Sequence, residues 1–292
     1  MAFDGPAHSA LTWDAVPELK DPYCVAGFHG WSNAGRVSSD ALDFLMETLK
    51  PKAFARISQE PFIDFALDRP IGRIEDGVIR ELEPLEDEIM CWKNPDGEHD
   101  LVLMLGKEPH VGWIAYSGII TALVARLSVK RLYTVGGMQD TISHYAPPIV
   151  SIVGSSPHVV ARAAKLDDGL RTGEYHGPVS IHSYLIRTCA DAGIEAVSLW
   201  GHVPAYVQKS PRVVAKIVTI LNKATKIECP VDDLQHEAIE FDRKIQEALL
   251  KDPNLKRLVE AIERDAPRTK PSSTDKVIRL NDFLRRDPHD DA

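Results

Sequence analysis

Chemically competent side chains follow four apolar stretches of the sequence, in short polar loops. The loops are HGWSNAG at 29–35, KEPH at 107–110, MQDTISHYAPP at 138–148 and HVPAYV at 202–207. They hold imidazoles, carboxylates, an amide and aromatic rings: His29, Trp31, Asn33, Glu108, His110, Asp140, His144, Tyr145, His202 and Tyr206. In an open α/β sheet, ligands bind beyond the carboxyl ends of the strands. We therefore expect these loops to share one edge of a sheet and to form the candidate site.

An enzymatic site is one hypothesis for this edge. Imidazoles and carboxylates transfer protons, and Glu108 and Asp140 could form an acid and base pair. The catalytic set would then be His29, Glu108, Asp140, His144 and His202, in a hydrolase or a nucleoside-processing enzyme. Solvated or salt-bridged carboxylates are the commoner outcome for such residues. The sequence therefore leaves enzymatic activity open and favours its absence.

Complete signatures of several enzyme classes do not occur in the sequence. The loop after Phe28 matches neither GxGxxG nor GxxxxGK[ST], which disfavours phosphate binding. There is no GxSxG motif, and Ser117 in YSGI lies inside a helical pattern. The four cysteines form no CxxC pair, and the histidines form no HxH or HExxH pair. We therefore expect no disulfide framework, no metal site and no other cofactor.

The first loop is interpreted instead as a tight turn that carries a recognition surface. Gly30 and Gly35 are expected at positive φ or at close backbone contacts. Trp31 is expected to anchor an interface, because tryptophan is enriched among the residues that dominate binding energy. The candidate binding residues are Gly30, Trp31, Asn33, Gly35 and Tyr206.

Alternating strand and helix patterns position these loops. Strands are predicted at 23–28, 53–57, 100–106, 131–137, 149–155 and 195–201, and helices at 36–49, 113–127, 157–166 and 178–192. This alternation predicts a three-layer α/β/α sandwich around a mostly parallel sheet. The strands at 23–28 and 53–57 flank one helix, which favours a parallel pairing between them.

Two segments depart from the alternation. Residues 58–99 carry turn signals at Asp76-Gly77 and Asp96-Gly97, which predicts strands or hairpins inserted in, or flanking, the main sheet. Beyond residue 230 the pattern is helical, and Asp252-Pro253 divides it into two helices. We assign residues 1–230 to the α/β/α domain and 231–292 to a C-terminal helical extension with a polar tail.

The end of this extension contains a Pro/Ser-rich linker at 266–275 and a short helical pattern at 277–286.

Composition narrows the function further. Of the 292 residues, 44% are hydrophobic and 26% charged, which is typical of a globular protein. The formal net charge of −9 disfavours binding to nucleic acid or an anionic membrane. The chain lacks a run of about 20 apolar residues that could span a bilayer, and its first residues lack a signal-peptide pattern. We therefore expect a cytoplasmic protein.

Several motifs together resemble the PAC2 family, the proteasome assembly chaperone 2-like proteins. They are GFHGWSNAG, FIDFALDRP, LVLMLGKEPHVGW, TVGGMQDTISHYAPPIVSIVGSS, YHGPVSI and GIEAVSLWGHVPAYV. Their order and spacing, and the helical extension after residue 231, are similar to the actinobacterial-type branch. The resemblance covers about residues 11 to 286.

The resemblance implies an α/β/α fold similar to phosphorylase/hydrolase-like domains, a cytoplasmic location and a homo-oligomer, which we expect to be a trimer. Eukaryotic and archaeal members are proteasome-assembly or proteasome-binding chaperones. The archaeal proteasome-binding members end in a hydrophobic–Tyr–any tail, whereas this chain ends in His289-Asp290-Asp291-Ala292. Proteasome subunits are candidate partners, but docking through that tail is not expected.

The leading hypothesis is a non-enzymatic protein-interaction factor of the assembly-chaperone type, and the alternative is the hydrolase or nucleoside-processing enzyme. Apolar residues support self-association. Segment 58–99 contains Phe62, Phe65, Ile71 and Ile74. The extension adds an apolar stripe that includes Phe241. Both surfaces are predicted to lie between subunits; the alternative is that both segments fold back on their own domain, which is the usual case for amphipathic helices.

Overall fold

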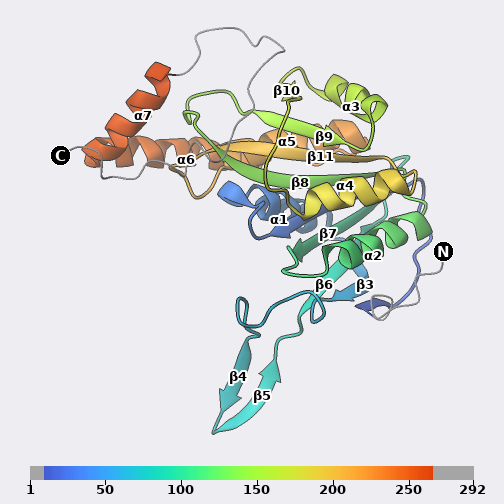
Figure 1. The fold of residues 1–292 in the computed structure, drawn as a ribbon. Helices are drawn as coiled ribbons and strands as arrows, with labels where there is room; N and C mark the ends of the chain where they lie inside the picture. Colours follow the sequence, from blue (N-terminus) through green and yellow to red (C-terminus); the bar gives the residue numbers. More distant parts are fainter. Residues whose placement is uncertain (1–9, 266–292) are drawn as a thin grey trace.

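The computed structural model describes residues 10–265, and in them a nine-stranded sheet lies between two layers of helices (Figure 1). The strand order is β1-β3-β6-β7-β2-β8-β11-β9-β10. Four central strands are parallel neighbours: β7 (Leu101–Lys107), β2 (Tyr23–His29), β8 (Arg131–Asp140) and β11 (Ala196–Pro204). The predicted three-layer α/β/α class is confirmed. Because these strands are parallel, their carboxyl ends and following loops share one edge.

The outer strands are antiparallel to this centre or to one another. On one side lie β6 (Glu86–Trp92), β3 (Lys52–Ser58) and β1 (Leu11–Trp13), and on the other β9 (Val150–Gly154) and β10 (Leu170–Arg171). The predicted direct pairing of β2 with β3 is wrong, because β6 and β7 lie between them. The chain crosses from β2 through α1 to β3 and leaves two strand positions between them. β6 and β7, which are joined as a hairpin, occupy these two positions.

Helices cover both faces of the sheet. α1 (Val37–Leu49) and α5 (Pro211–Thr225) pack on one face, and α2 (Trp113–Arg126) and α4 (Ile181–Asp191) on the other. α3 (Pro157–Ala163) and two short 3-10 helices, η2 (Ala34–Arg36) and η3 (Ala164–Leu166), complete this part of the chain. Along β11, Leu199 and Val203 point to the α1 and α5 face. Their neighbours Trp200 and His202 point to the other face, because side chains alternate along a strand.

The C-terminal extension begins with two helices, as predicted. α6 (Asp232–Lys251) ends before Asp252, and Pro253 opens α7 (Pro253–Asp265). The apolar stripe of α6 packs on α5, and its buried members are Leu234, Ala238, Ile245 and Leu249. The prediction that this stripe lies between subunits is therefore wrong: the chain buries it against its own core. The linker and final helix predicted after residue 265 lie outside the described residues.

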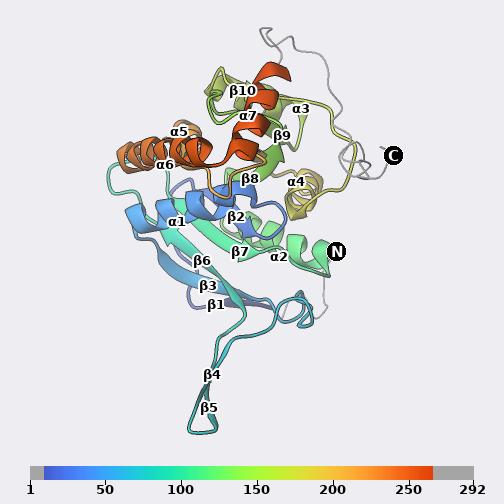
Figure 2. The ribbon, with the colours of Figure 1, turned by 90° about the vertical axis from the view of Figure 1, so that its left-hand side faces the viewer.

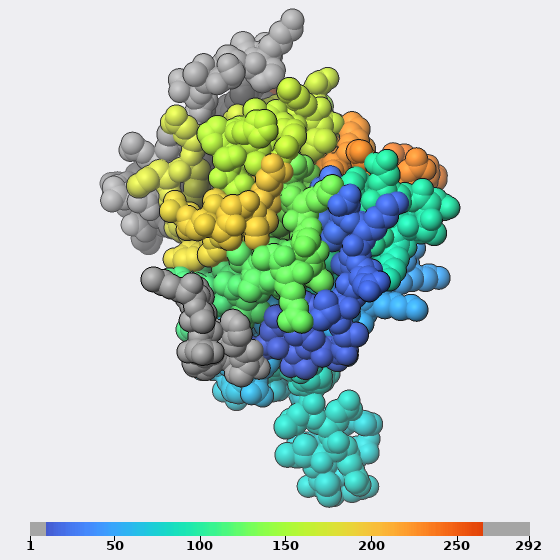
Figure 3. All heavy atoms as spheres, turned by 90° about the vertical axis from the view of Figure 1, so that its right-hand side faces the viewer, coloured from blue at the N-terminus to red at the C-terminus, as the bar shows by residue number. Residues whose placement is uncertain are grey.

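A hairpin arm, residues 71–82, projects from the body (Figures 2 and 3). Its strands are β4 (Gly72–Glu75) and β5 (Val78–Leu82), joined at Asp76-Gly77, which confirms the predicted hairpin. Every residue of both strands is exposed. At the base of the arm, Phe62 is buried against Tyr116, so this part of the segment belongs to the core.

Candidate functional site

The loop after β2 is a rigid turn held by its own side chains. The Asn33 Oδ1 atom accepts hydrogen bonds from the backbone N–H groups of Ser38 (2.9 Å) and Ser39 (3.1 Å), in the first turn of α1. Such bonds satisfy donors that a helix start leaves free. The Ser38 hydroxyl in turn accepts from the Phe28 N–H of β2 at 2.8 Å. The Asn33 side chain therefore caps the N-terminus of α1.

Two glycines let this turn lie directly on the sheet. Gly30 and Gly35 have φ of 120° and 58°, as the sequence predicted. A Cβ on Gly35 would lie 2.6 Å from a methyl group of Val203. The turn also pairs with β8, where the Gly137 N–H donates to the Ser32 carbonyl at 2.7 Å. The glycines thus serve the backbone path of the turn.

Glu108 links three loops. Its Oε2 accepts from the Trp31 N–H at 3.2 Å, and its Oε1 accepts from the Ile181 N–H at the start of α4 at 2.9 Å. A carboxylate at a helix N-terminus is favoured by the helix dipole. Glu108 therefore fixes Trp31 relative to α4, which is a structural role for a residue that the enzymatic hypothesis assigned to catalysis.

Exposed apolar side chains gather around the N-termini of α2 and α4. Trp31 is 60% exposed and Ile114 is 73% exposed. We call this group the carboxyl-edge surface; it consists of Trp31, Val111, Ile114, Val179 and Tyr184, all exposed. The Trp113 ring stacks edge-on against Tyr184 at 5.4 Å, which ties the two helices together. Exposed apolar groups held on rigid backbone are typical of protein-binding surfaces.

His182, which the sequence did not single out, packs against the turn that follows β2. It is fully buried in α4, and its Nε2 lies 3.1 Å from the Ser32 hydroxyl. Its ring packs between Phe28 and Trp200. Burial lowers the pKa of His182 to about 3, so the imidazole is neutral. A lone His inside a helical pattern gives no sequence signal for this contact.

Asp140 and His202 come together at the ends of β8 and β11. The His202 Nδ1 lies 2.7 Å from the Asp140 Oδ2, and its Nε2 lies 2.7 Å from the Ser151 hydroxyl of β9. The hydrogen bond from His202 lowers the pKa of Asp140 below its ordinary value. Ser151 was missed because it lies within a strand and outside any nucleophile motif. Only the antiparallel pairing of β9 with β11 brings it to His202.

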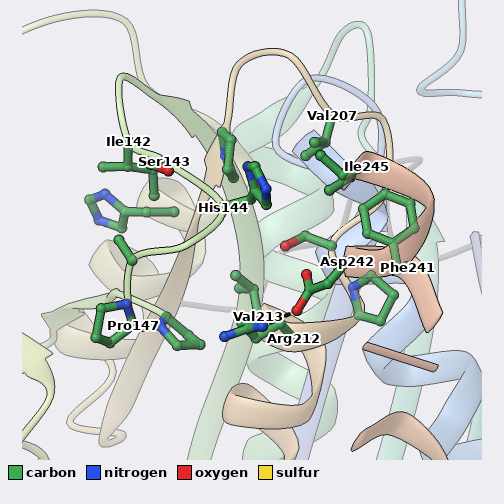
Figure 4. A pocket seen from close by; sticks show the side chains of 16 residues that line it. Ile142, Ser143, His144, Pro147, Val207, Arg212, Val213, Phe241, Asp242 and Ile245 are labelled. Carbon is green, nitrogen blue, oxygen red and sulfur yellow. Dashed lines mark hydrogen bonds and ion pairs between the residues drawn. The ribbon is translucent and has the colours of Figure 1, made fainter. Parts of the chain in front are cut away.

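His144 lies in a separate cluster against the extension (Figure 4). Its Nδ1 is 2.7 Å from the Tyr206 hydroxyl, and its Nε2 is 3.3 Å from the Gln246 amide of α6. Burial lowers the pKa of His144. The cavity beside it, between the loop after β8, α5 and α6, holds about 30 Å³, enough for about one water molecule. Tyr206, a predicted binding residue, is here a half-buried partner of His144.

The structure thus divides the predicted catalytic set. Only Asp140 and His202 are joined through their side chains. Glu108 braces the turn after β2, His144 contacts α6, and the His29 side chain is exposed at the end of β2. His110 accepts from the Asp64 N–H at 3.0 Å.

In residues 10–265, no group of three or more His, Cys, Asp or Glu side chains is placed to hold a metal ion. Among the same residues, no helix is both long and apolar enough to cross a membrane.

The fold and this edge define a three-layer α/β/α protein with a rigid turn that presents an exposed tryptophan. The PAC2 family model matches residues 27–249, and the chain belongs to the PAC2 family. Comparison with curated protein sequences gave no match.

Solved structures agree with this assignment. A proteasome-assembly chaperone homologue from Mycobacterium tuberculosis is 30% identical, with a TM-score of 0.73 over 81% of this chain and 99% of that one. A PAC2 family protein from Streptomyces avermitilis is 29% identical, with a TM-score of 0.70 over 78% of this chain and 95% of that one. An archaeal proteasome activator from Pyrococcus furiosus, 20% identical over 82% of this chain and 97% of that one, shares the fold with a TM-score of 0.66.

Proposed function

We propose that the protein is an assembly-chaperone-like interaction factor of the cytoplasm that binds a protein partner through the carboxyl-edge surface. The observation that carries the proposal is Trp31, an exposed indole on a turn fixed by Asn33 and Glu108. A large apolar side chain on a preorganised backbone loses little conformational entropy on binding. This role requires no catalysis.

Proteasome subunits are the partner class that we propose. The support is membership of the PAC2 family and the similarity to a solved proteasome-assembly chaperone homologue. The carboxyl-edge surface offers apolar contact area for a folded or partly assembled subunit, and it needs no C-terminal docking tail.

Affinity capture from lysate of the source cells tests the proposal. Bait proteins are the wild type, Trp31→Ala, and Leu250→Ala as a matched control, because Leu250 is an 86% exposed apolar residue on α6. The expected result is a stoichiometric proteasome subunit that Trp31→Ala loses and Leu250→Ala keeps. Loss of a buried tryptophan anchor commonly weakens binding by more than about 2 kcal/mol, or roughly 30-fold. Capture that is equal for all three baits, or absent from all three, would contradict the proposal.

We also propose that the chain acts as a homo-oligomer, a trimer, with the hairpin arm between subunits. The arm carries five aliphatic side chains that are half or more exposed: Ile71, Ile74, Val78, Ile79 and Leu82. An isolated two-stranded hairpin is marginally stable in water, so a covering surface would stabilise it.

A further inference from the structure

Three neighbouring strands place an acid, a base and a hydroxyl in one line on the α4 face of the sheet. Asp140 ends β8, His202 lies two residues before the end of β11, and Ser151 is the second residue of β9. Ser151 is paired in register with Trp200, so it lies diagonal to His202. The two hydrogen bonds that join the line are both 2.7 Å long.

Hydrogen-bond chemistry fixes the direction of the protons along this line. The Asp140 carboxylate accepts from the Thr141 N–H through Oδ1 and from His202 through Oδ2. An ionised carboxylate can only accept, so the proton shared with Asp140 is on Nδ1 of His202, and the form of the ring that can activate Ser151 carries no other proton. Nε2 then holds a lone pair, and the Ser151 hydroxyl donates to it. This is the arrangement in which an imidazole activates a serine as a nucleophile.

The surroundings of Ser151 leave room for a reactant. Its register neighbour on β10 is Arg171, which is exposed, and Val153, on the same face of β9, is 50% exposed. This part of the α4 face is therefore open to solvent. The Trp200 indole leans the other way, over β8, where a Cβ on Gly136 would be 2.9 Å from it. Ser151 thus lies in register between Trp200 of β11 and Arg171 of β10.

We propose that Ser151, His202 and Asp140 form a nucleophilic acyl-transfer centre for esters of small carboxylic acids. The Ser151 Oγ attacks the ester carbonyl carbon while its proton passes to the His202 Nε2. The carbon–oxygen bond to the alcohol then breaks, and the alcohol leaves with that proton. Water next attacks the acyl carbon while one of its protons passes to the His202 Nε2. The bond from that carbon to the Ser151 Oγ breaks, Oγ takes the proton back from His202, and the acid leaves.

The remaining groups have distinct roles in this reaction. Asp140 is a positioning residue that holds His202 in the required tautomer. Arg171, the register neighbour of Ser151, brings positive charge to this part of the sheet, where it helps to keep Asp140 ionised and would favour the negative charge that develops on the carbonyl oxygen. The centre is separate from the carboxyl-edge surface around Trp31, so its activity and partner binding can be measured independently.

A fluorophosphonate probe tests the centre directly on the full chain. The probe forms an oxygen–phosphorus bond with an activated serine and releases fluoride. We expect one adduct per chain by intact mass, mapped to Ser151 by peptide sequencing, and a stoichiometric burst of p-nitrophenol from p-nitrophenyl acetate. Ser151→Ala should abolish both signals. Ser183→Ala is the matched control, because Ser183 is a half-buried serine on α4 outside the line, and it should react as the wild type does.

The other variants separate catalysis from hydrogen bonding that only supports the fold. Asp140→Asn keeps the side-chain shape, removes the charge that fixes the tautomer, and should slow labelling by about 100-fold or more, as expected for lost general-base assistance. Arg171→Ala should slow it less. Each variant is included only if its thermal unfolding curve matches the wild type. A folded wild type that remains unlabelled, or labelling that persists in Ser151→Ala, would overturn the proposal, whatever the result for Trp31.

Discussion

His182 stabilises both the fold and the candidate site, because it is buried in the core and contacts the turn that carries Trp31. Its imidazole is buried, neutral and in contact with Ser32 of the first turn. The sequence could place it on a helix but could not indicate its burial, because the turn that covers it is 150 residues away. Glu108 is a similar case. Its place in a polar loop did not indicate that its carboxylate accepts hydrogen bonds from the N–H groups of Trp31 and Ile181.

The neutral state of His182 predicts a pH dependence of stability. In the unfolded chain an imidazole protonates near pH 6.5, whereas in the fold its pKa is about 3. The unfolded state therefore binds more protons below pH 6.5, and the free energy of unfolding falls as the pH falls from 6.5 towards 3. At pH 5 the loss from this group is on the order of 2 kcal/mol relative to pH 7, at roughly 1.4 kcal/mol per pH unit.

Urea titrations of the wild type and His182→Gln at pH 7 and pH 5 measure this effect. Glutamine retains a donor and an acceptor but has no proton to gain, so the variant should lose less stability between the two pH values. Asp87 has a raised pKa of about 6 and contributes with the opposite sign, but it is present in both proteins and cancels in the difference. Equal pH dependence in the two proteins would show that His182 is not the source.

At the scale of elements, the sequence indicated the strands and helices better than it indicated their neighbours. Periodicity located β2, α1 and β3, but strand order depends on contacts that hydrophobic patterns do not encode, so the pairing of β2 with β3 was wrong. The same limit hid Ser151, because its approach to His202 depends on β9 running antiparallel to β11. The four loops were predicted correctly at one edge because the strands that precede them, β2, β7, β8 and β11, are parallel neighbours.

The connection from β2 to α1 allows a test of whether contact with β11 determines its backbone path. At Gly35, alanine would meet both a left-handed backbone (φ 58°) and the Val203 methyl group 2.6 Å away. Gly193 has a similar φ of 72°, but a Cβ there would meet nothing within 4 Å. Gly193→Ala should therefore cost only the backbone term, roughly 1–2 kcal/mol. Gly35→Ala should cost more by about 1–3 kcal/mol of overpacking.

Denaturant unfolding of both variants gives the two free energies on one scale. A larger loss for Gly35→Ala shows that contact with β11 sets the path of the first turn. If the two losses are equal, backbone conformation alone accounts for the turn.

For the whole molecule, the arm is the feature that the fold of one chain does not explain. Its charged residues pair within the arm, where Arg73 contacts Glu75 (2.9 Å) and Glu81 (3.2 Å). Its aliphatic residues remain in solvent, and Ile74 lies opposite Ile79 in the ladder. Since α6 packs on its own α5, the arm is the feature of residues 10–265 that still supports the proposed self-association. Phe241→Asp should accordingly disturb the packing of α6 on the core, where Phe241 lies, rather than assembly as such.

Substitution of the arm tests the trimer without touching the core. Ile74→Asp with Ile79→Asp puts two carboxylates where we expect apolar contact between subunits, and burying unpaired charge there would cost several kcal/mol per subunit. Light scattering coupled to size exclusion should give about three times 32.4 kDa for the wild type and 32.4 kDa for the double variant. Leu250→Asp, at an exposed position on α6, is the control and should remain trimeric. Because both arm residues are exposed and lie outside the core, circular dichroism should match the wild type. A wild type that runs at 32.4 kDa across micromolar dilutions would show that the arm is not a subunit interface.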